Sequence, residues 1–281
     1  MTAAQTNASK DQSLRIAGGK VGVLLLHGLC GTPAEMRFVA MGLARAGYTV
    51  HAPQLAGHGA ENNGRWQDWY LSARHALNEI RKECDTVIVG GLCMGAILGL
   101  HLAARNPGKV QGVSLFSPTL WINGWAMPWT MRLFRLVHAR WFAKLINFPD
   151  SDSLGIKCPR VRQFVKQALD TDGDYGRAGV PGTMVLEHRR MVDAAMKLLH
   201  RVKQPTLIVH SQEDDYANIN NAHYLQGEIH GKVDMVVLND SYHMVTLDKQ
   251  RQVVVDRTRA FIARIVEEVC HIATPALPVA A

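Results

Sequence analysis

Short apolar runs alternate with segments of helical spacing along most of this chain. A strand buried on both faces of a parallel sheet reads as a continuous apolar run, and the crossover between two such strands usually contains a helix. The alternation therefore predicts an α/β fold with a mostly parallel sheet covered by helices on both faces. The expected strands are residues 21–26, 48–51, 86–89, 110–117, 205–210 and 235–238, and the expected helices are 36–46, 66–84, 94–105 and 251–269.

The same alternation indicates how the 281 residues are organised. A chain of this length can bury one full core. The rhythm holds over residues 21–117 and 205–270, which we assign to that core, and it breaks over residues 118–204. We interpret 118–204 as a helical cap, or lid, inserted over the carboxyl edge of the sheet. Residues 1–20 form a polar N-terminal segment, and residues 271–281 form a tail.

Composition argues against several classes of protein. No apolar run reaches the roughly 20 residues of a membrane-spanning helix, and residues 1–20 lack the apolar core of a secretory signal, so we expect a cytoplasmic protein. The net charge of +7 is spread along the chain without a dense basic run, which does not favour nucleic acid as a partner. Five scattered cysteines without a CxxC pair favour free thiols and predict no metal site. No cofactor motif and no signal for a particular oligomeric state are present.

One glycine-flanked cysteine has the setting of a catalytic nucleophile. The sequence Gly91-Leu92-Cys93-Met94-Gly95 lies between an expected strand and an expected helix. In that context, G-x-S-x-G forms a nucleophile elbow, whose central residue has a strained backbone and whose neighbours must be small. Here sulfur replaces the hydroxyl oxygen. The positive end of the helix that begins at Met94 favours a thiolate, so we predict that Cys93 is a nucleophile.

A base and an acid are expected after the nucleophile in the chain order of this elbow fold. His243 follows the last expected strand and precedes the final helix, so its imidazole should lie at the same sheet edge as Cys93. Asp214 follows the preceding strand in the same way and could hold the imidazole tautomer. Asp215 is its rival, because one residue decides which carboxylate points inward.

A glycine-rich loop follows the first expected strand, at residues 27–31 (HGLCG). This fold places half of its oxyanion hole there. We therefore expect the backbone N–H groups of Leu29 and Met94 to stabilise negative charge on the substrate oxygen. Cys30 is expected near Cys93, either as a partner for a reversible disulfide or as a buried apolar residue.

The cap segment is rich in aromatic and basic residues. Phe134, Val137, Trp141 and Leu145 fall on one face of an expected helix, and basic side chains without any acidic partner accompany them. Such a helix either packs on the body with a solvated outer face, or covers an acyl-chain tunnel and contacts anionic lipid or an acyl-CoA phosphate. The predicted substrate-binding residues are Trp121, Trp125, Trp129, Phe134 and Trp141.

At the level of motifs, the chain resembles bacterial monoacylglycerol lipases and related small carboxylesterases, members of the α/β-hydrolase superfamily. The resemblance runs from Val21 to Ile265, with the cap poorly matched. It implies that Cys93 is the nucleophile, Asp214 the acid and His243 the base, and it favours Asp214 over Asp215. The stretches that carry it are His27-Gly28 with Gly31-Thr32-Pro33, Ala46-Gly47-Tyr48-Thr49-Val50, Gly57-His58-Gly59, Asp68-Trp69, the elbow, and Ser241-Tyr242-His243 with Thr246-Leu247-Asp248.

Cys93 is the main departure from that family, which has serine at this position. In having cysteine at the elbow, the chain is similar to dienelactone hydrolases, bile-acid N-acyltransferases and polyhydroxyalkanoate synthases. Three hypotheses follow. The first is a hydrolase that cleaves an acyl ester or thioester through an acyl-cysteine. The second is an acyltransferase that passes the acyl group to an amine or alcohol, and the third, a non-catalytic binder, is disfavoured because His243 and Asp214 are present.

Overall fold

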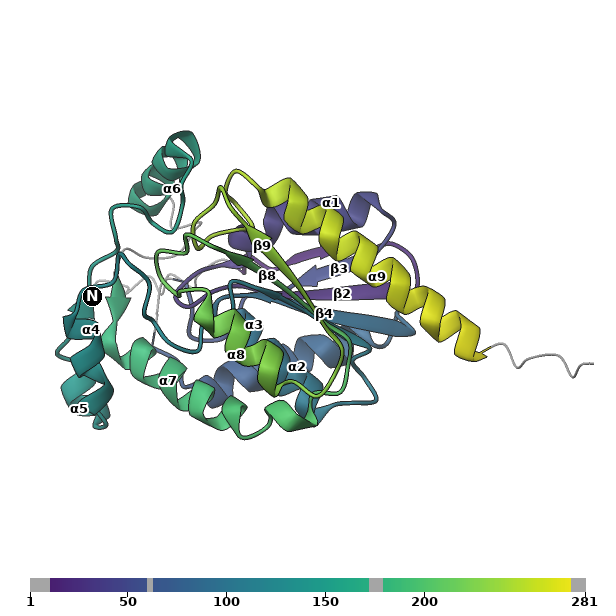
Figure 1. Cartoon of the computed structure of the whole chain (residues 1–281), viewed down its shortest axis with the longest axis horizontal. Coiled ribbons are helices and arrows are strands. Elements are labelled where there is room, and N and C mark those ends of the chain that lie inside the picture. Colours follow the sequence, from purple (N-terminus) through teal and green to yellow (C-terminus); the bar gives the residue numbers. More distant parts are fainter. Residues whose placement is uncertain (1–10, 60–62, 172–178, 274–281) are drawn as a thin grey trace, which may run out of the picture.

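A single sheet runs through the centre of the molecule (Figure 1). The computed structural model describes residues 11–59, 63–171 and 179–273. The sheet has the strand order β1-β3-β2-β4-β5-β8-β9, and every neighbouring pair is parallel except β1 with β3. Its strands are β1 (Leu14–Ile16), β2 (Val21–Leu26), β3 (Thr49–Ala52), β4 (Thr86–Leu92), β5 (Gly112–Phe116), β8 (Thr206–Ser211) and β9 (Val233–Leu238). The predicted α/β fold with a mostly parallel sheet is confirmed.

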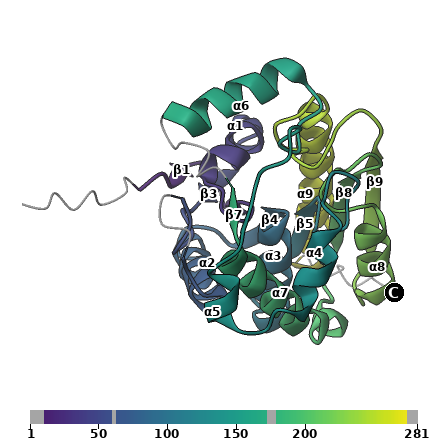
Figure 2. The same ribbon diagram turned by 90° about the vertical axis from the view of Figure 1, so that its left-hand side faces the viewer.

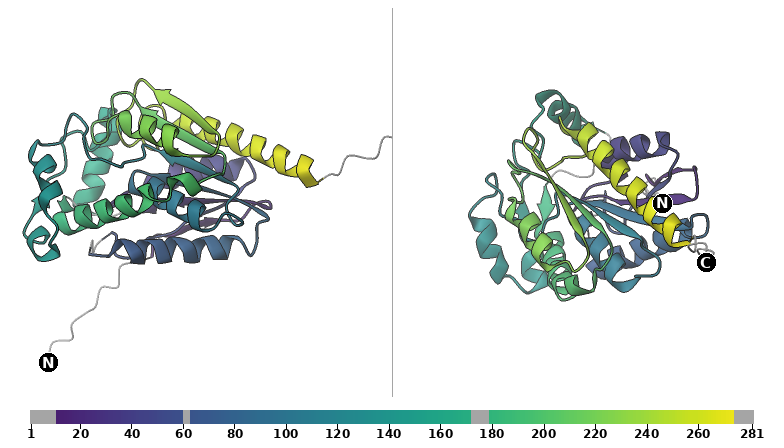
Figure 3. Two further views of the ribbon diagram at one scale, coloured as in Figure 1. Left: turned by 60° about the horizontal axis from the view of Figure 1, so that its bottom comes forward. Right: turned by 45° about the vertical axis from the view of Figure 1, so that its right-hand side comes forward.

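Helices cover both faces of this sheet, and each face has its own apolar core (Figure 3). On one face lie α2 (Trp66–Ile80), α3 (Met94–Arg105), α7 (Gly182–Met196) and α8 (Asn220–Glu228). On the other lie α1 (Arg37–Arg45), which follows a 3-10 turn (Pro33–Met36), and α9 (Arg251–Ala273). β2 and β4 are almost wholly buried between the two cores, which explains their continuous apolar sequences.

The four predicted core helices and six predicted strands are all present, with boundaries shifted by a few residues. The largest shifts are in α2, which ends at Ile80 rather than at Cys84, and in α9, which ends at Ala273 rather than at Val269. β1 and α8 were not predicted. β1 is only three residues long, and α8 has little amphipathic character, so neither carries a strong periodic signal. Residues 1–10 and 274–281 lie outside the described residues.

The segment after β5 forms a set of short elements at one end of the sheet (Figure 2). Here a sequence expectation was wrong. Phe134, Val137, Trp141 and Leu145 do not share one helix, because the chain breaks into short turns separated by extended residues at Val137 and Ala139. The elements are α4 (Thr130–Leu133), a 3-10 turn (Phe134–Leu136), α5 (Arg140–Ala143), β6 (Asn147–Phe148), α6 (Pro159–Thr171), β7 (Val180–Pro181) and α7. The division at residues 118 and 204 stays a prediction, and α7 itself packs on α2 and α3.

Glu187 on α7 joins the short cap elements to the body. Its side chain is buried and accepts hydrogen bonds from Arg140 on α5 at 2.9 Å and from Arg190 at 2.8 Å. The backbone N–H of Trp66, at the start of α2, also donates to it at 3.3 Å. A buried carboxylate is stable only when it is paired in this way.

In the described part of the chain, no helix is long and apolar enough to cross a membrane.

We predict that Glu187→Ala lowers the free energy of unfolding by about 2 kcal/mol, because it leaves partly buried guanidinium groups without their acceptor. Urea denaturation measures this loss. Glu79→Ala is the matched control, since Glu79 pairs with Lys82 at the surface and its loss should change the free energy of unfolding much less. Equal losses in the two variants would show that Glu187 contributes no more than a surface ion pair.

Candidate active site

Cys93 occupies a sharp turn between β4 and α3. Its φ of 54° and ψ of −114° lie in a region that L-residues rarely adopt, so the predicted backbone strain is confirmed. The turn is possible because its neighbours lack side chains. A Cβ on Gly91 would lie 2.3 Å from the carbonyl of Gly95, and a Cβ on Gly95 would lie 2.3 Å from the carbonyl oxygen of Leu26. The N–H of Cys93 donates to Phe116 at 2.9 Å, which holds the turn against β5.

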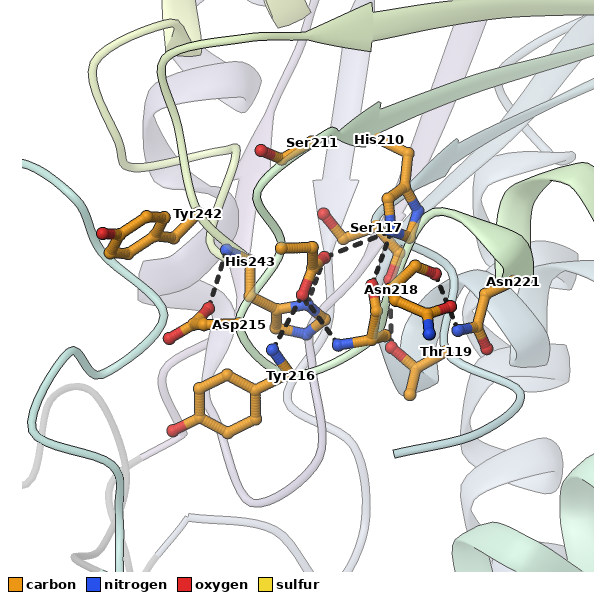
Figure 4. Close-up of polar contacts among 12 residues, drawn as sticks. Ser117, Thr119, His210, Ser211, Asp215, Tyr216, Asn218, Asn221, Tyr242 and His243 are labelled. Carbon is orange, nitrogen blue, oxygen red and sulfur yellow. Dashed lines mark hydrogen bonds and ion pairs between the residues drawn. The ribbon is translucent and has the colours of Figure 1, made fainter. Parts of the chain in front are cut away.

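His243 and Asp214 meet at the same edge of the sheet. Asp214 follows β8, His243 follows β9, and their side chains contact each other through Nδ1 of the imidazole and Oδ2 of the carboxylate at 2.8 Å. Both residues are buried. The backbone N–H groups of Tyr216 and Ala217 donate to Oδ1 of Asp214 at 2.9 and 2.7 Å, so the carboxylate has a fixed orientation. His210 lies on its other side, with Nε2 3.3 Å from Oδ2 (Figure 4).

Asp215 points away from the imidazole ring. Its carboxylate accepts the backbone N–H of His243 at 3.2 Å (Figure 4), and it also accepts the hydroxyl of Ser153. Tyr216 lies against the ring of His243, with the centroids 5.1 Å apart. The geometry thus separates the two neighbouring carboxylates: Asp214 contacts the side chain of His243, and Asp215 contacts its main chain.

The ionisation of His243 follows from these neighbours. Burial alone would lower its pKa, but the negative charges of Asp214 and Cys93 raise the pKa of His243 well above its usual 6.5. Burial acts on Asp214 in the opposite sense, yet His243 holds the pKa of that carboxyl below its usual value. Nε2 of His243 makes no hydrogen bond of normal geometry, but the Cys93 side chain interacts with His243 and is one of the groups that raise its pKa, and both residues line the same cavity. The arrangement suits proton exchange between Nε2 and a group bound beside Cys93.

The glycine-rich loop after β2 is held by buried side chains. Glu35 accepts the N–H of Gly28 at 2.7 Å. Nδ1–H of His27 donates to the carbonyl of Gly28 at 2.9 Å, and Nε2 of His27 accepts the N–H of Leu55 at 3.1 Å, which determines the tautomer. His58 lies edge-on to both His27 and Trp69, so three of the separate sequence motifs form one support for this loop. Leu29 lines the cavity beside Cys93, and Met94 is the buried first residue of α3.

A cavity of about 340 Å³ opens beside Cys93 and His243. Most of its wall is apolar, from residues in the cap and its borders: Ile122, Met127, Met131, Phe148, Leu154, Val165, Leu169, Val180 and Val185. Cys30 also lines it, and burial raises the pKa of that thiol far above its usual value. Cys30, Cys84, Cys93 and Cys158 are free thiols, and nothing is described for the side chain of Cys270.

The predicted substrate-binding residues lie elsewhere. Trp121, Trp125, Trp129 and Trp141 are exposed and do not line the cavity beside Cys93, with Trp129 71% and Trp141 73% exposed. Phe134 is buried in the core of the cap with Phe148. Trp121 packs edge-on against Tyr224 and Trp125 against Tyr242, and the extended residues at Val137 and Ala139 break the helix that was expected to carry Trp141. Smaller and more flexible side chains such as Ile122, Met127 and Met131 face the cavity.

Two buried carboxylates escaped the sequence reasoning. Asp248 accepts four backbone N–H groups at 2.8–2.9 Å, from Tyr242, Lys249, Lys157 and Cys158, and so joins the His243 loop to the cap. Glu35 is the second. Both accept hydrogen bonds from main-chain groups, which leave no signal in the sequence. Asp248 belongs to one of the motifs that carry the family resemblance, but that motif does not indicate its role. Among the described residues, no group of three or more His, Cys, Asp or Glu side chains could hold a metal ion.

Comparison with known proteins identifies the family of this chain. The model of the serine aminopeptidase S33 family matches residues 20–250. The chain belongs to this family. It is therefore a member of the α/β-hydrolase superfamily, as the sequence motifs implied.

Individual relatives span nearly the whole chain. A thermostable monoacylglycerol lipase of Bacillus sp. (strain H-257) is 30% identical over 251 residues, which cover 88% of this chain and 92% of the relative. A carboxylesterase of Bacillus subtilis (strain 168) is 25% identical over 255 residues, covering 88% and 94%. A solved structure described with LipS and LipT, two lipolytic enzymes derived from a metagenome, superposes with a TM-score of 0.76 at 29% identity, covering 90% of this chain and 97% of that one.

We predict that Glu35→Ala loosens the glycine-rich loop of this family member, because the N–H of Gly28 loses its buried acceptor. Hydrogen exchange at residues 28–31 should accelerate, and the free energy of unfolding should fall by about 1–3 kcal/mol. Glu35→Gln keeps an acceptor oxygen. Since burial raises the pKa of Glu35 to about 7, the neutral amide replaces a carboxyl that is itself partly neutral at that pH. Equal acceleration in both variants would contradict this role for Glu35.

Proposed function

We propose that this protein is an ester hydrolase that cleaves an acyl ester or thioester through an acyl-cysteine intermediate on Cys93. The observation that carries the proposal is the arrangement of Cys93 at a strained elbow beside His243, whose ring is held by Asp214 at 2.8 Å. Relatives named as a monoacylglycerol lipase and a carboxylesterase support the reaction class. The resemblance outside Cys93 is to enzymes that use water as the acceptor.

In the first half of the reaction, the thiolate of Cys93 attacks the carbonyl carbon and a carbon–sulfur bond forms. The bond to the leaving alcohol or thiol breaks, and Nε2 of the protonated His243 gives its proton to that leaving group. In the second half, His243 accepts a proton from water as the water attacks the thioester. The carbon–sulfur bond then breaks, the free acid leaves, and the thiolate and imidazolium are restored. Asp214 keeps Nδ1 protonated throughout.

The N–H groups of Leu29 and Met94 would stabilise the negative charge on the carbonyl oxygen during each attack. Leu29 lies in the loop held by Glu35 and His27, and Met94 begins α3, whose N-terminal dipole adds to the effect. A pre-positioned donor of this kind lowers the barrier by roughly 3 kcal/mol. The loop contacts therefore support catalysis, because they fix one donor before substrate binds.

An acyl chain is the substrate portion that suits the cavity. The wall is largely apolar and about 340 Å³ in volume, which accommodates a hydrocarbon chain beside Cys93. A monoacylglycerol or similar lipid ester is thus the leading substrate. An acyl-CoA is a second acyl donor with the same chain chemistry, and basic side chains of the cap could meet its phosphates.

The outer surface of the cap supports contact with a lipid surface. The exposed apolar side chains there are Trp125, Trp129, Leu133, Leu136, Trp141, Phe142 and Leu145. Arg135 and Lys144 lie among them, and residues 118–149 contain no acidic residue. Exposed tryptophans beside basic groups suit the interface of an anionic bilayer. This surface, rather than the cavity, is where the tryptophans of the cap would act.

An acyltransferase is the alternative because of the sulfur at residue 93. Amines attack thioesters more readily, relative to water, than they attack oxygen esters. An acyl-Cys93 therefore favours transfer more than an acyl-serine would. The free thiol at the elbow is the observation that supports this alternative, and the products distinguish the two reactions.

We predict that kcat/KM stays high above pH 6.5 and falls on the alkaline side as His243 loses its proton, because its pKa is raised well above 6.5. Asp214→Asn removes the main charge that raises this pKa, so the alkaline limb should move to lower pH. The pH dependence of kcat/KM measures both effects. An alkaline limb that Asp214→Asn does not move would contradict the assignment.

We also predict that incubation with p-nitrophenyl decanoate adds one decanoyl group to Cys93, seen by intact mass and peptide mapping. Cys93→Ala should lose the adduct and nearly all turnover, whereas Cys30→Ala should keep both. If Cys93→Ala retains turnover, the nucleophile is another residue.

Product analysis with and without amine and alcohol acceptors separates hydrolysis from transfer. Free decanoic acid as the only product supports the hydrolase. If the native enzyme acylates the acceptor, and if Cys93→Ser forms less of that product with a matching rise in free acid, the protein is a transferase instead.

A further inference from the structure

His188 on α7 is a buried side chain that the proposed mechanism does not use. It is only 3% exposed, yet it lines the cavity that contains Cys93 and His243. Both of its ring nitrogens lack a hydrogen-bond partner, although the backbone of Thr119 comes near the ring. Burial lowers the pKa of His188 to about 4, so the imidazole is neutral at physiological pH. It then offers one N–H donor and one nitrogen acceptor.

The other polar side chains on the described cavity wall already have partners. Glu35 bonds to Gly28, Thr119 donates to the carbonyl of Ser117, Asp150 accepts the N–H of Gly179, and Ser151 donates to Tyr216. His243 bonds to Asp214 and directs its free nitrogen to the reaction. Within the described wall, His188 is therefore the one histidine, carboxyl or hydroxyl outside the proposed triad with no hydrogen-bond partner.

The surroundings of His188 are those of a hydrocarbon site. Val185, one helical turn earlier on α7, lines the same cavity, as do Ile122 and Met131 of the cap. An unpartnered imidazole in such a wall costs free energy that leucine would not. A ligand oxygen that bonds to the ring would remove that cost.

We propose that His188 binds a hydroxyl group carried on the acyl chain of the substrate, so that the enzyme prefers hydroxyacyl esters or thioesters to unsubstituted ones. A hydroxyl both donates and accepts, and so pairs with either tautomer of a neutral imidazole. An anionic substituent is disfavoured, because the wall is largely apolar and already contains the carboxyl groups of Glu35 and Asp150. One unpaired polar side chain in an apolar wall suits one hydroxyl on a hydrocarbon chain better than a polyol, which needs several hydrogen-bond partners.

The inference rests on the proposed function, because it names the acyl group that Cys93 would receive. The test compares kcat/KM for p-nitrophenyl decanoate with that for the esters of 3-, 6- and 10-hydroxydecanoic acid. The native enzyme should prefer at least one hydroxy isomer by about tenfold. His188→Leu should abolish that preference by lowering kcat/KM for the preferred hydroxy isomer about tenfold relative to decanoate, while His188→Gln should keep part of the preference. Met131→Leu, a change in the apolar wall, should alter all four esters alike.

Three outcomes would overturn the proposal. The first is a native enzyme with no preference for any hydroxy isomer. The second is an equal loss on all four esters in His188→Leu, which would indicate a general structural role. The third is a His188→Leu variant that loses activity on 1-decanoylglycerol but not on propyl decanoate. That result would place the hydroxyl that His188 binds on the alcohol rather than on the acyl chain.

Binding separates this inference from the proposed function. Neutral methyl esters of decanoic and hydroxydecanoic acids bind the cavity whether or not the protein turns them over, and calorimetry with Cys93→Ala measures their affinity. If no ester is hydrolysed but a hydroxy ester binds about tenfold more tightly, and His188→Leu removes the difference, the proposed function fails and the role of His188 stands. If all esters are hydrolysed and the affinities are equal, the role of His188 fails alone.

Discussion

The site depends on the close approach of the end of β2 to the start of α3. A Cβ on Gly95 would lie 2.3 Å from the carbonyl oxygen of Leu26, so the two segments can be this close only if residue 95 is glycine. That contact brings the loop after Leu26 against the elbow at Cys93, and with it the N–H groups of Leu29 and Met94. The strained φ at Cys93 is part of the same geometry, and the buried packing of α3 stabilises it.

Buried polar groups then position the remaining parts of the site. Asp248 holds the His243 loop through four main-chain N–H groups, Glu35 holds the glycine-rich loop, and Glu187 holds the cap. In a low-dielectric interior each such bond is directional, and its loss leaves an unsatisfied group. His188 is the contrasting case, because both of its nitrogens are unpaired inside the cavity. Other buried polar atoms, among them Trp69 Nε1, Ser114 Oγ and Ser117 Oγ, also lack a partner, but these residues do not line the cavity, whereas His188 does.

The parts of this structure that the sequence predicted are those determined by local periodicity and chain order. Buried strands are continuous apolar runs, so their ends, and with them Cys93 and His243, could be placed at one sheet edge. The choice between Asp214 and Asp215 needed the motif resemblance, since adjacent residues differ only in side-chain direction. The aromatic side chains of the cap were misplaced because composition does not reveal where short turns interrupt a helix. Glu35 bonds to a main-chain N–H seven residues away, and His188 reaches the cavity only through the packing of α7, so no spacing in the sequence encodes either position.

The cap separates two kinds of apolar residue, and this separation has a functional consequence. Methionine and aliphatic side chains such as Met127, Met131 and Ile122 face the cavity, whereas tryptophans face outward. Flexible methionines adapt to chains of different shape, so an apolar wall of this kind discriminates weakly between acyl lengths. One missing methylene changes binding by only about 1–3 kcal/mol, whereas a hydrogen-bonding group unmatched by the substrate imposes a sharper selection. Selectivity among acyl groups in this cavity is therefore expected to come from the polar side chain of His188 more than from the apolar wall.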